Sequence, residues 1–138
     1  MQEKLNNLKN NSLLEVSHWW GLREAGKGGT IITNDKKIYY YTFYHRLTPF
    51  LEKNNLPQEY ISEGRTLTNE EYDRVIKFIE EEIVGKTYEF HRIFDAGYNV
   101  RGTYKERTFN IPNNIGYGDE PGLYNKADNL IKSLKGGI

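Results

Sequence analysis

Residues 67–84 read LTNEEYDRVIKFIEEEIV, and this stretch decides the fold because it predicts a helix with one apolar face. Thr68 and Glu71 have the spacing of a capping box, in which each side chain accepts a hydrogen bond from the other residue's backbone N–H. Gly85 follows as a helix stop. The apolar positions recur at helical spacing: Tyr72, Val75, Ile76, Ile79 and Ile83. This face has to be buried against another layer of structure.

Three segments before this helix have the composition of strands. Residues 13–20 (LLEVSHWW) alternate along an extended chain, and residues 30–33 (TIIT) and 38–45 (IYYYTFYH) are β-branched and aromatic. Asn and Asp between the last two supply turn chemistry, so these segments predict a hairpin. The glycine-rich residues 21–29 are expected to connect the first two strands. They lack the P-loop pattern and do not open a helix, which argues against a phosphate-binding loop.

Strands and a second helix are also expected after residue 85. Residues 87–94 (TYEFHRIF), 98–104 (YNVRGTY) and 107–111 (RTFNI) predict strands, the last two joined by a tight turn at Lys105-Glu106. A final helix is predicted over 123–135. Its inner face holds Leu123, Ala127, Leu130, Ile131 and Leu134.

This order of elements predicts the α+β class. We expect a single two-layer domain over residues 13–138, with a mostly antiparallel sheet of about five strands and two amphipathic helices on one face. Residues 1–12 are expected to form a flexible or frayed lead-in. Residues 47–65 contain two prolines and predict a long excursion with one helical turn near residues 48–54.

The composition excludes several classes of protein. The chain has 138 residues, of which 37% are hydrophobic, so one ordinary core is expected. Nineteen basic residues balance nineteen acidic ones, which argues against nucleic acid as the partner. There are no cysteines, which excludes disulfides and thiol chemistry. The absence of a long apolar run or a signal-like start predicts a cytoplasmic protein that does not enter a membrane.

The catalytic candidates are histidines in predicted strands. His45 and His91, with Arg92 beside the latter, could form an acid–base pair that acts on phosphodiesters or nucleotides. None of the three histidines of the chain has a second ligand at metal-binding spacing, so neither a metal nor a cofactor is expected. The structural interpretation of these residues is favoured, and the chain is predicted not to be an enzyme.

Aromatic residues are the most unusual feature of the sequence. Residues 38–45 carry large side chains on both faces of the predicted strand, whereas a half-buried strand alternates apolar and polar positions. Two helices cover one face, so the other has to be covered by residues 47–65, a second subunit or a ligand. We therefore expect at least two of five aromatic side chains to be partly exposed in the isolated chain, or to become buried only in an oligomer: Trp19, Tyr39, Tyr41, Phe43 and Tyr44. The predicted binding surface is Trp19, Trp20, Tyr39, Tyr41, Phe43, Tyr44 and Arg46.

The order of elements resembles that of small bacterial inhibitor and immunity proteins, including the emfourin-type inhibitors of metalloproteases. The matching pieces are residues 28–33 (GGTIIT), the helix from Thr68, residues 95–100 and residues 123–134, while residues 47–65 depart from that pattern. The resemblance implies a non-enzymatic protein that masks or sequesters a partner. Another protein is the expected partner. A nucleotide-like small molecule, a second copy of the chain and a small phosphodiesterase remain alternatives.

Overall fold

An antiparallel sheet of seven strands forms the centre of the computed structural model, which describes residues 2–20, 26–44, 52–55, 58–87, 96–115 and 121–135. The strands are β1 (Ser12–Trp20), β2 (Gly26–Thr33), β3 (Lys37–Tyr44), β4 (Glu59–Ile61), β5 (Arg65–Thr66), β6 (Ala96–Tyr104) and β7 (Arg107–Pro112). The helices are α1 (Gln2–Asn10), α3 (Asn69–Glu82) and α4 (Leu123–Lys135).

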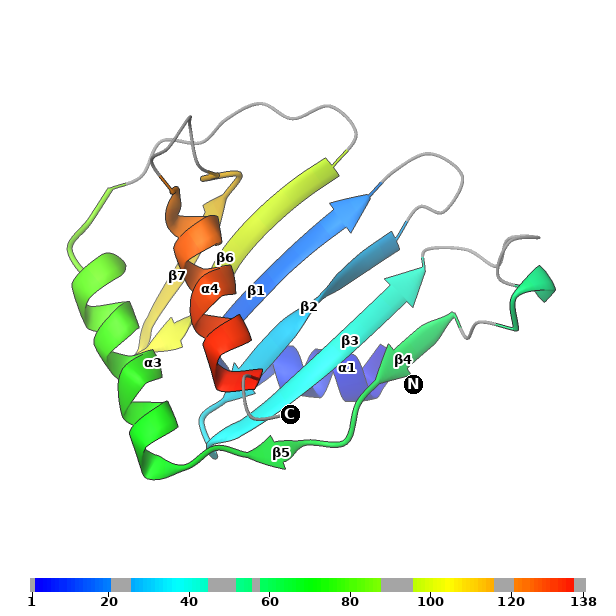
Figure 1. Cartoon of the computed structure of the whole chain (residues 1–138), viewed down its shortest axis with the longest axis horizontal. Coiled ribbons are helices and arrows are strands. Elements are labelled where there is room, and N and C mark those ends of the chain that lie inside the picture. Colours follow the sequence, from blue (N-terminus) through cyan, green and yellow to red (C-terminus); the bar gives the residue numbers. More distant parts are fainter. Residues whose placement is uncertain are drawn as a thin grey trace.

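Strand β1 lies in the middle of the sheet, whose order is β4-β3-β2-β1-β6-β7, with β5 also paired to β3 (Figure 1). All these pairings are antiparallel, so the predicted class and the predicted kind of sheet are confirmed. The sheet has seven strands rather than about five because β4 forms inside the predicted excursion and β5 begins at its last residue. Elsewhere in that excursion, Glu52 and Lys53 are helical.

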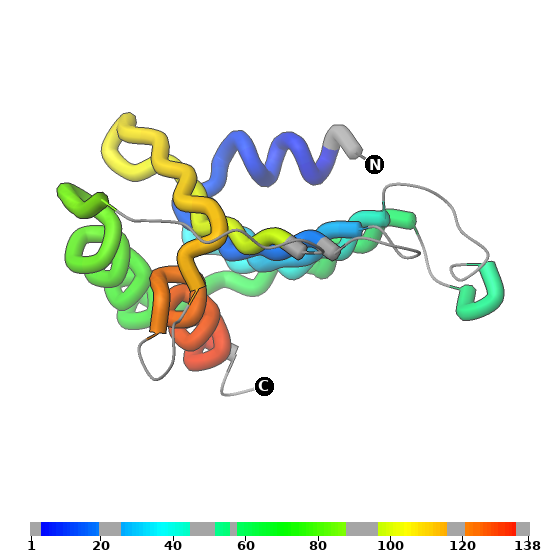
Figure 2. Tube along the Cα trace, turned by 90° about the horizontal axis from the view of Figure 1, so that it is seen from above, coloured from blue at the N-terminus to red at the C-terminus, as the bar shows by residue number. Residues whose placement is uncertain are grey.

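Helices cover both faces of the sheet. Helices α3 and α4 lie together on one face, as predicted, while α1 lies on the opposite face (Figure 2). Helix α1 comes from residues expected to be flexible or frayed, yet its Leu5 is buried against Ile31 of β2 and Tyr41 of β3. The aromatic strand is therefore covered on its second side by α1, and not only by the segments expected to cover it.

The main core lies between the sheet and the pair α3 and α4. It includes fully buried strand residues such as Leu14, Ile32 and Val100, together with Ile79 of α3 and Ala127 of α4. The apolar positions of both helices were predicted from helical spacing, and the buried ones face this core. Most of the buried apolar side chains lie in this layer, and a smaller apolar cluster lies on the α1 side of the sheet.

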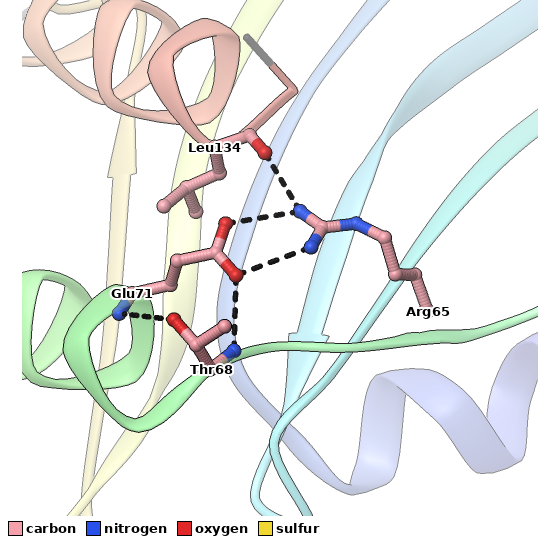
Figure 3. Close-up of polar contacts among 4 residues, drawn as sticks. All are labelled: Arg65, Thr68, Glu71 and Leu134. Carbon is pink, nitrogen blue, oxygen red and sulfur yellow. Dashed lines mark hydrogen bonds and ion pairs between the residues drawn. The ribbon is translucent and has the colours of Figure 1, made fainter. Parts of the chain in front are cut away.

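The predicted capping box of α3 is present and is extended by a third residue (Figure 3). The Glu71 N–H donates to the Thr68 hydroxyl at 3.1 Å, and the Thr68 N–H donates to the Glu71 carboxylate at 2.9 Å. Arg65 of β5 donates two hydrogen bonds to the same carboxylate, at 3.1 and 3.2 Å, and a third to the Leu134 carbonyl at 2.7 Å. Arg65 therefore joins the sheet edge to both helices.

The glycine-rich segment differs from its prediction. Residues 26–29 belong to β2 rather than to a connection, and Gly28 and Gly29 pair with His18 and Ser17 of β1. A Cβ at Gly29 would lie 2.6 Å from the Val16 carbonyl oxygen, so only glycine fits this close approach of the two strands. Of the predicted strand 87–94, all but Thr87 lie outside the described residues.

Candidate binding face

The side chains beside α1 are arranged in rows across four strands. Strand register places Trp19 of β1 opposite Lys27 of β2, and Lys27 opposite Phe43 of β3. On its other side Trp19 lies opposite Gly97 of β6, where a Cβ would clash with the indole. Because side chains alternate along strands, these residues project to the same face as the partly buried Arg101. We call Lys9, Trp19, Lys27, Phe43 and Arg101 the basic–aromatic face.

A buried carboxylate lies at the centre of this face. Glu15 of β1 is 0% exposed, and its Oε2 lies 3.7 Å from the Lys9 ammonium of α1 and 3.9 Å from the Lys27 ammonium. Its Oε1 lies 3.4 Å from the Arg101 Nε. Three elements therefore each supply one cation to a single carboxylate. A buried charge of this kind is maintained only when it is paired.

Tyr41 completes the cluster from the far side of β2. Its hydroxyl donates a hydrogen bond of 2.6 Å to Glu15 Oε2, although β2 lies between the two strands that carry these residues. The residue opposite Tyr41 on β2 is Gly29, which leaves room for the phenol ring to cross that strand. Lys9 lies over the same ring, 5.4 Å from its centroid. Helix α1 is thus anchored by charge as well as by Leu5.

Burial shifts the pKa values of two side chains in this cluster, Lys27 and Tyr41. Burial, together with the nearby Lys9 ammonium, lowers the pKa of Lys27 to about 8, although Glu15 opposes the change. Burial raises the pKa of Tyr41, and the Glu15 carboxylate raises it further. The phenol therefore keeps its proton for Glu15 throughout the neutral range. The cluster carries three cationic side chains around one carboxylate.

The aromatic residues predicted to form a binding surface are divided by the structure. Trp19 is 38% exposed, Tyr39 and Phe43 are half-buried on its face, and Tyr41 is buried beneath α1. Tyr44 is half-buried too, but alternation places it on the opposite face. The expectation that at least two of these side chains are partly exposed is confirmed. Arg46 and the side chain of Trp20 lie outside the described residues.

The predicted catalytic candidates fall outside the part of the chain that the structure describes. His45, His91 and Arg92 lie outside it, so their prediction stays untested. His18 stacks on Tyr98 with ring centroids 6.0 Å apart, on the face that carries α4, and burial lowers its pKa. In the described residues no three His, Asp or Glu side chains are placed to hold a metal ion. No described helix is long and apolar enough to cross a membrane.

Sequence reasoning missed the charged half of this face. Glu15 is the one acid within the apolar strand LLEVSHWW, and it projects to the same side as Ser17 and Trp19. A lone acid among buried positions predicts a cationic partner elsewhere in the fold, because unpaired buried charge is strongly unfavourable. That signal was available. Which cations would pair with it depended on strand order and on α1.

Comparisons with protein-family models, with curated proteins and with solved structures find no match to this chain. The resemblance to emfourin-type inhibitors therefore rests on the order of elements alone, and the function has to be argued from the basic–aromatic face.

Proposed function

We propose that the chain is a non-catalytic binding protein of the inhibitor or immunity type, which masks another protein through the basic–aromatic face. The observation that carries this proposal is the exposure of Trp19 next to a group of half-buried cations. Exposed tryptophan and arginine are the side chains that most often dominate the binding energy of protein interfaces.

The shape of the face favours a protein over a small molecule. Its strand residues are spread over β6, β1, β2 and β3, which at roughly 4.8 Å per strand is about 14 Å across the sheet. Small-molecule sites are concave and enclose most of their ligand. A broad sheet surface that presents an exposed aromatic side chain beside arginine and other polar side chains is instead typical of a protein interface.

The test is capture of the partner by matched baits. Wild-type protein, Trp19→Ala and Val84→Ala are immobilised, exposed to lysate of the native host, and the retained proteins are identified by mass spectrometry. Val84 is the matched control because it is an apolar residue that is 43% exposed, beside α3. We expect one protein to be retained by the wild type and by Val84→Ala and lost with Trp19→Ala. A central interface tryptophan contributes about 2 kcal/mol or more to affinity.

The control also tests a competing location. Val84 lines a hollow of about 440 Å³ between the end of α3 and the turn that joins β6 to β7. If Val84→Ala loses the partner and Trp19→Ala keeps it, the proposal is wrong and the partner docks at that hollow. If both baits retain the same proteins as the wild type, the basic–aromatic face is not an interface. Circular dichroism of each variant establishes that it is folded.

A further inference from the structure

Positive charge is in excess at the centre of the basic–aromatic face. Lys9, Lys27 and Arg101 all lie within 4 Å of Glu15, and none of them has another carboxylate within that distance in the described residues. Glu15 Oε2 already receives the Tyr41 hydroxyl and lies near both ammonium groups. One carboxylate therefore serves three cations.

These cations are also within reach of a partner. The side chains of Lys9 and Lys27 are 18% and 20% exposed and that of Arg101 is 40% exposed, whereas Glu15 is enclosed beneath them. The face consequently presents positive charge outward and keeps its negative charge inside. Trp19 lies directly opposite Lys27 in the strand register, so an aromatic contact is available next to the cations.

We infer that the partner presents an acidic segment to this face, with a carboxylate that binds between Lys27 and Arg101 beside Trp19. This inference rests on the proposed function and adds the chemistry of the partner. A second carboxylate would neutralise the excess cations, and partly buried charge pairs of this kind contribute strongly to specificity and association rate. It would also favour the protonated form of Lys27, which burial now disfavours.

The direct test uses a defined acidic probe. A hexaglutamate peptide is titrated into the Trp20→Phe variant at low salt, and the fluorescence of Trp19, the other tryptophan of the chain, reports binding. Hexalysine and ATP are titrated in parallel. We expect saturable binding of hexaglutamate that weakens roughly tenfold with either Lys27→Met or Arg101→Met and persists with Lys132→Met. Lys132 is the matched control because its side chain is 70% exposed on α4, on the other side of the sheet.

The pH dependence of this binding adds a second readout. Binding should weaken as pH rises through about 8, where Lys27 loses its proton, and this change should be absent in Lys27→Met. Among the described residues, the titratable groups that share this face with Lys27 include Lys9 of α1, Glu15 of β1, Arg101 of β6, Tyr39 and Tyr41 of β3, and Glu59 of β4.

The outcomes separate this inference from the proposed function. Equal binding of hexaglutamate by Lys27→Met and the wild type, or binding of hexalysine, overturns the inference. Tighter binding of ATP than of hexaglutamate overturns it in favour of a nucleotide-like ligand. If the captured partner is lost with Trp19→Ala but retained by Lys27→Met and Arg101→Met, the proposed function stands and the acidic segment is wrong. If hexaglutamate binds as expected but no partner depends on Trp19, the proposed function fails instead.

Discussion

The two faces of the sheet are stabilised by different means. The face under α3 and α4 is packed with aliphatic side chains from β1, β2, β3, β6 and both helices, as at Ile32, Val100 and Ile79. The face under α1 has a small apolar cluster around Ile31 and, next to it, Glu15 with its cations. An apolar core tolerates changes of side-chain shape as long as its total volume is kept. A buried charge, in contrast, destabilises the fold when one of its partners is removed. The proposed basic–aromatic face lies on this second, charge-dependent side of the sheet.

The largest effect is expected from removing the buried carboxylate. Glu15→Ala leaves Lys9, Lys27 and Arg101 without their anion, and breaking a buried charge pair in this way costs about 3–5 kcal/mol. The free energy of unfolding in urea measures this loss. The double variant Glu15→Met, Lys27→Met should recover part of it, since one of the uncompensated charges is gone. A loss below about 1 kcal/mol for Glu15→Ala would mean that the cluster is solvated rather than structural.

Truncating one apolar residue on each face compares their packing directly. Ile79→Ala on α3 removes a fully buried side chain and should cost about 2–5 kcal/mol. Leu8→Ala on α1 removes a half-buried one and should cost about 1 kcal/mol. Thermal or chemical unfolding of both variants gives the two values. Equal losses would show that apolar contacts hold α1 as firmly as α3, and would contradict the view that the α1 face depends mainly on charge.

The cap of α3 should matter less than its packing. Thr68→Ala removes the hydroxyl that accepts the Glu71 N–H and should lower stability by about 1 kcal/mol. Thr87→Ala, at an exposed position beyond the helix, is the matched control and should leave the unfolding midpoint unchanged. If Thr68→Ala lowers the free energy of unfolding by much more than Ile79→Ala does, the α3 face depends on its hydrogen bonds more than on its core.

The smallest effect is expected in the pH dependence of stability. The pKa of Lys27 falls from its ordinary 10.5 to about 8 in the folded chain, so between these values the unfolded chain binds more protons than the folded one. Stability contributed through Lys27 therefore rises with pH, by less than about 1 kcal/mol from about pH 7 to about pH 8.5. Subtracting the unfolding free energies of Lys27→Met from those of wild type isolates this term. A difference that is flat, or that falls as pH rises, contradicts the lowered pKa.

Local patterns were sufficient to predict one half of the fold. The capping box of α3 joins residues three apart, and the β6–β7 hairpin turns at Lys105-Glu106, where both residues have positive φ. The apolar spacing of α4 likewise predicted its inner face. In each of these elements the decisive interactions are short in sequence, so the sequence alone carried the information.

The other half depends on contacts that only the assembled sheet provides. Helix α1 has Leu5 and Leu8 as its main apolar residues, too few for a stable isolated helix, and it forms because Ile31, Tyr41 and Glu15 offer it a surface. Residues 26–29 form a strand because they pair with β1 on one side and β3 on the other, and at Gly29 the β1 backbone lies too close for a side chain. The candidate face joins α1, β1, β2, β3 and β6, so the predicted aromatic residues could be named while their cationic neighbours could not.

The central position of β1 has a consequence for synthesis of the chain. One of its edges pairs with β2, which follows within a few residues, but the other pairs with β6, which begins at residue 96. At ribosomal rates of 5–20 residues per second, roughly 4–15 s pass between these two strands. Throughout that interval the nascent chain presents an unpaired strand edge rich in aliphatic and aromatic residues, the kind of surface that chaperones bind and that aggregates form on. Slower translation of residues 21–95 would lengthen that interval.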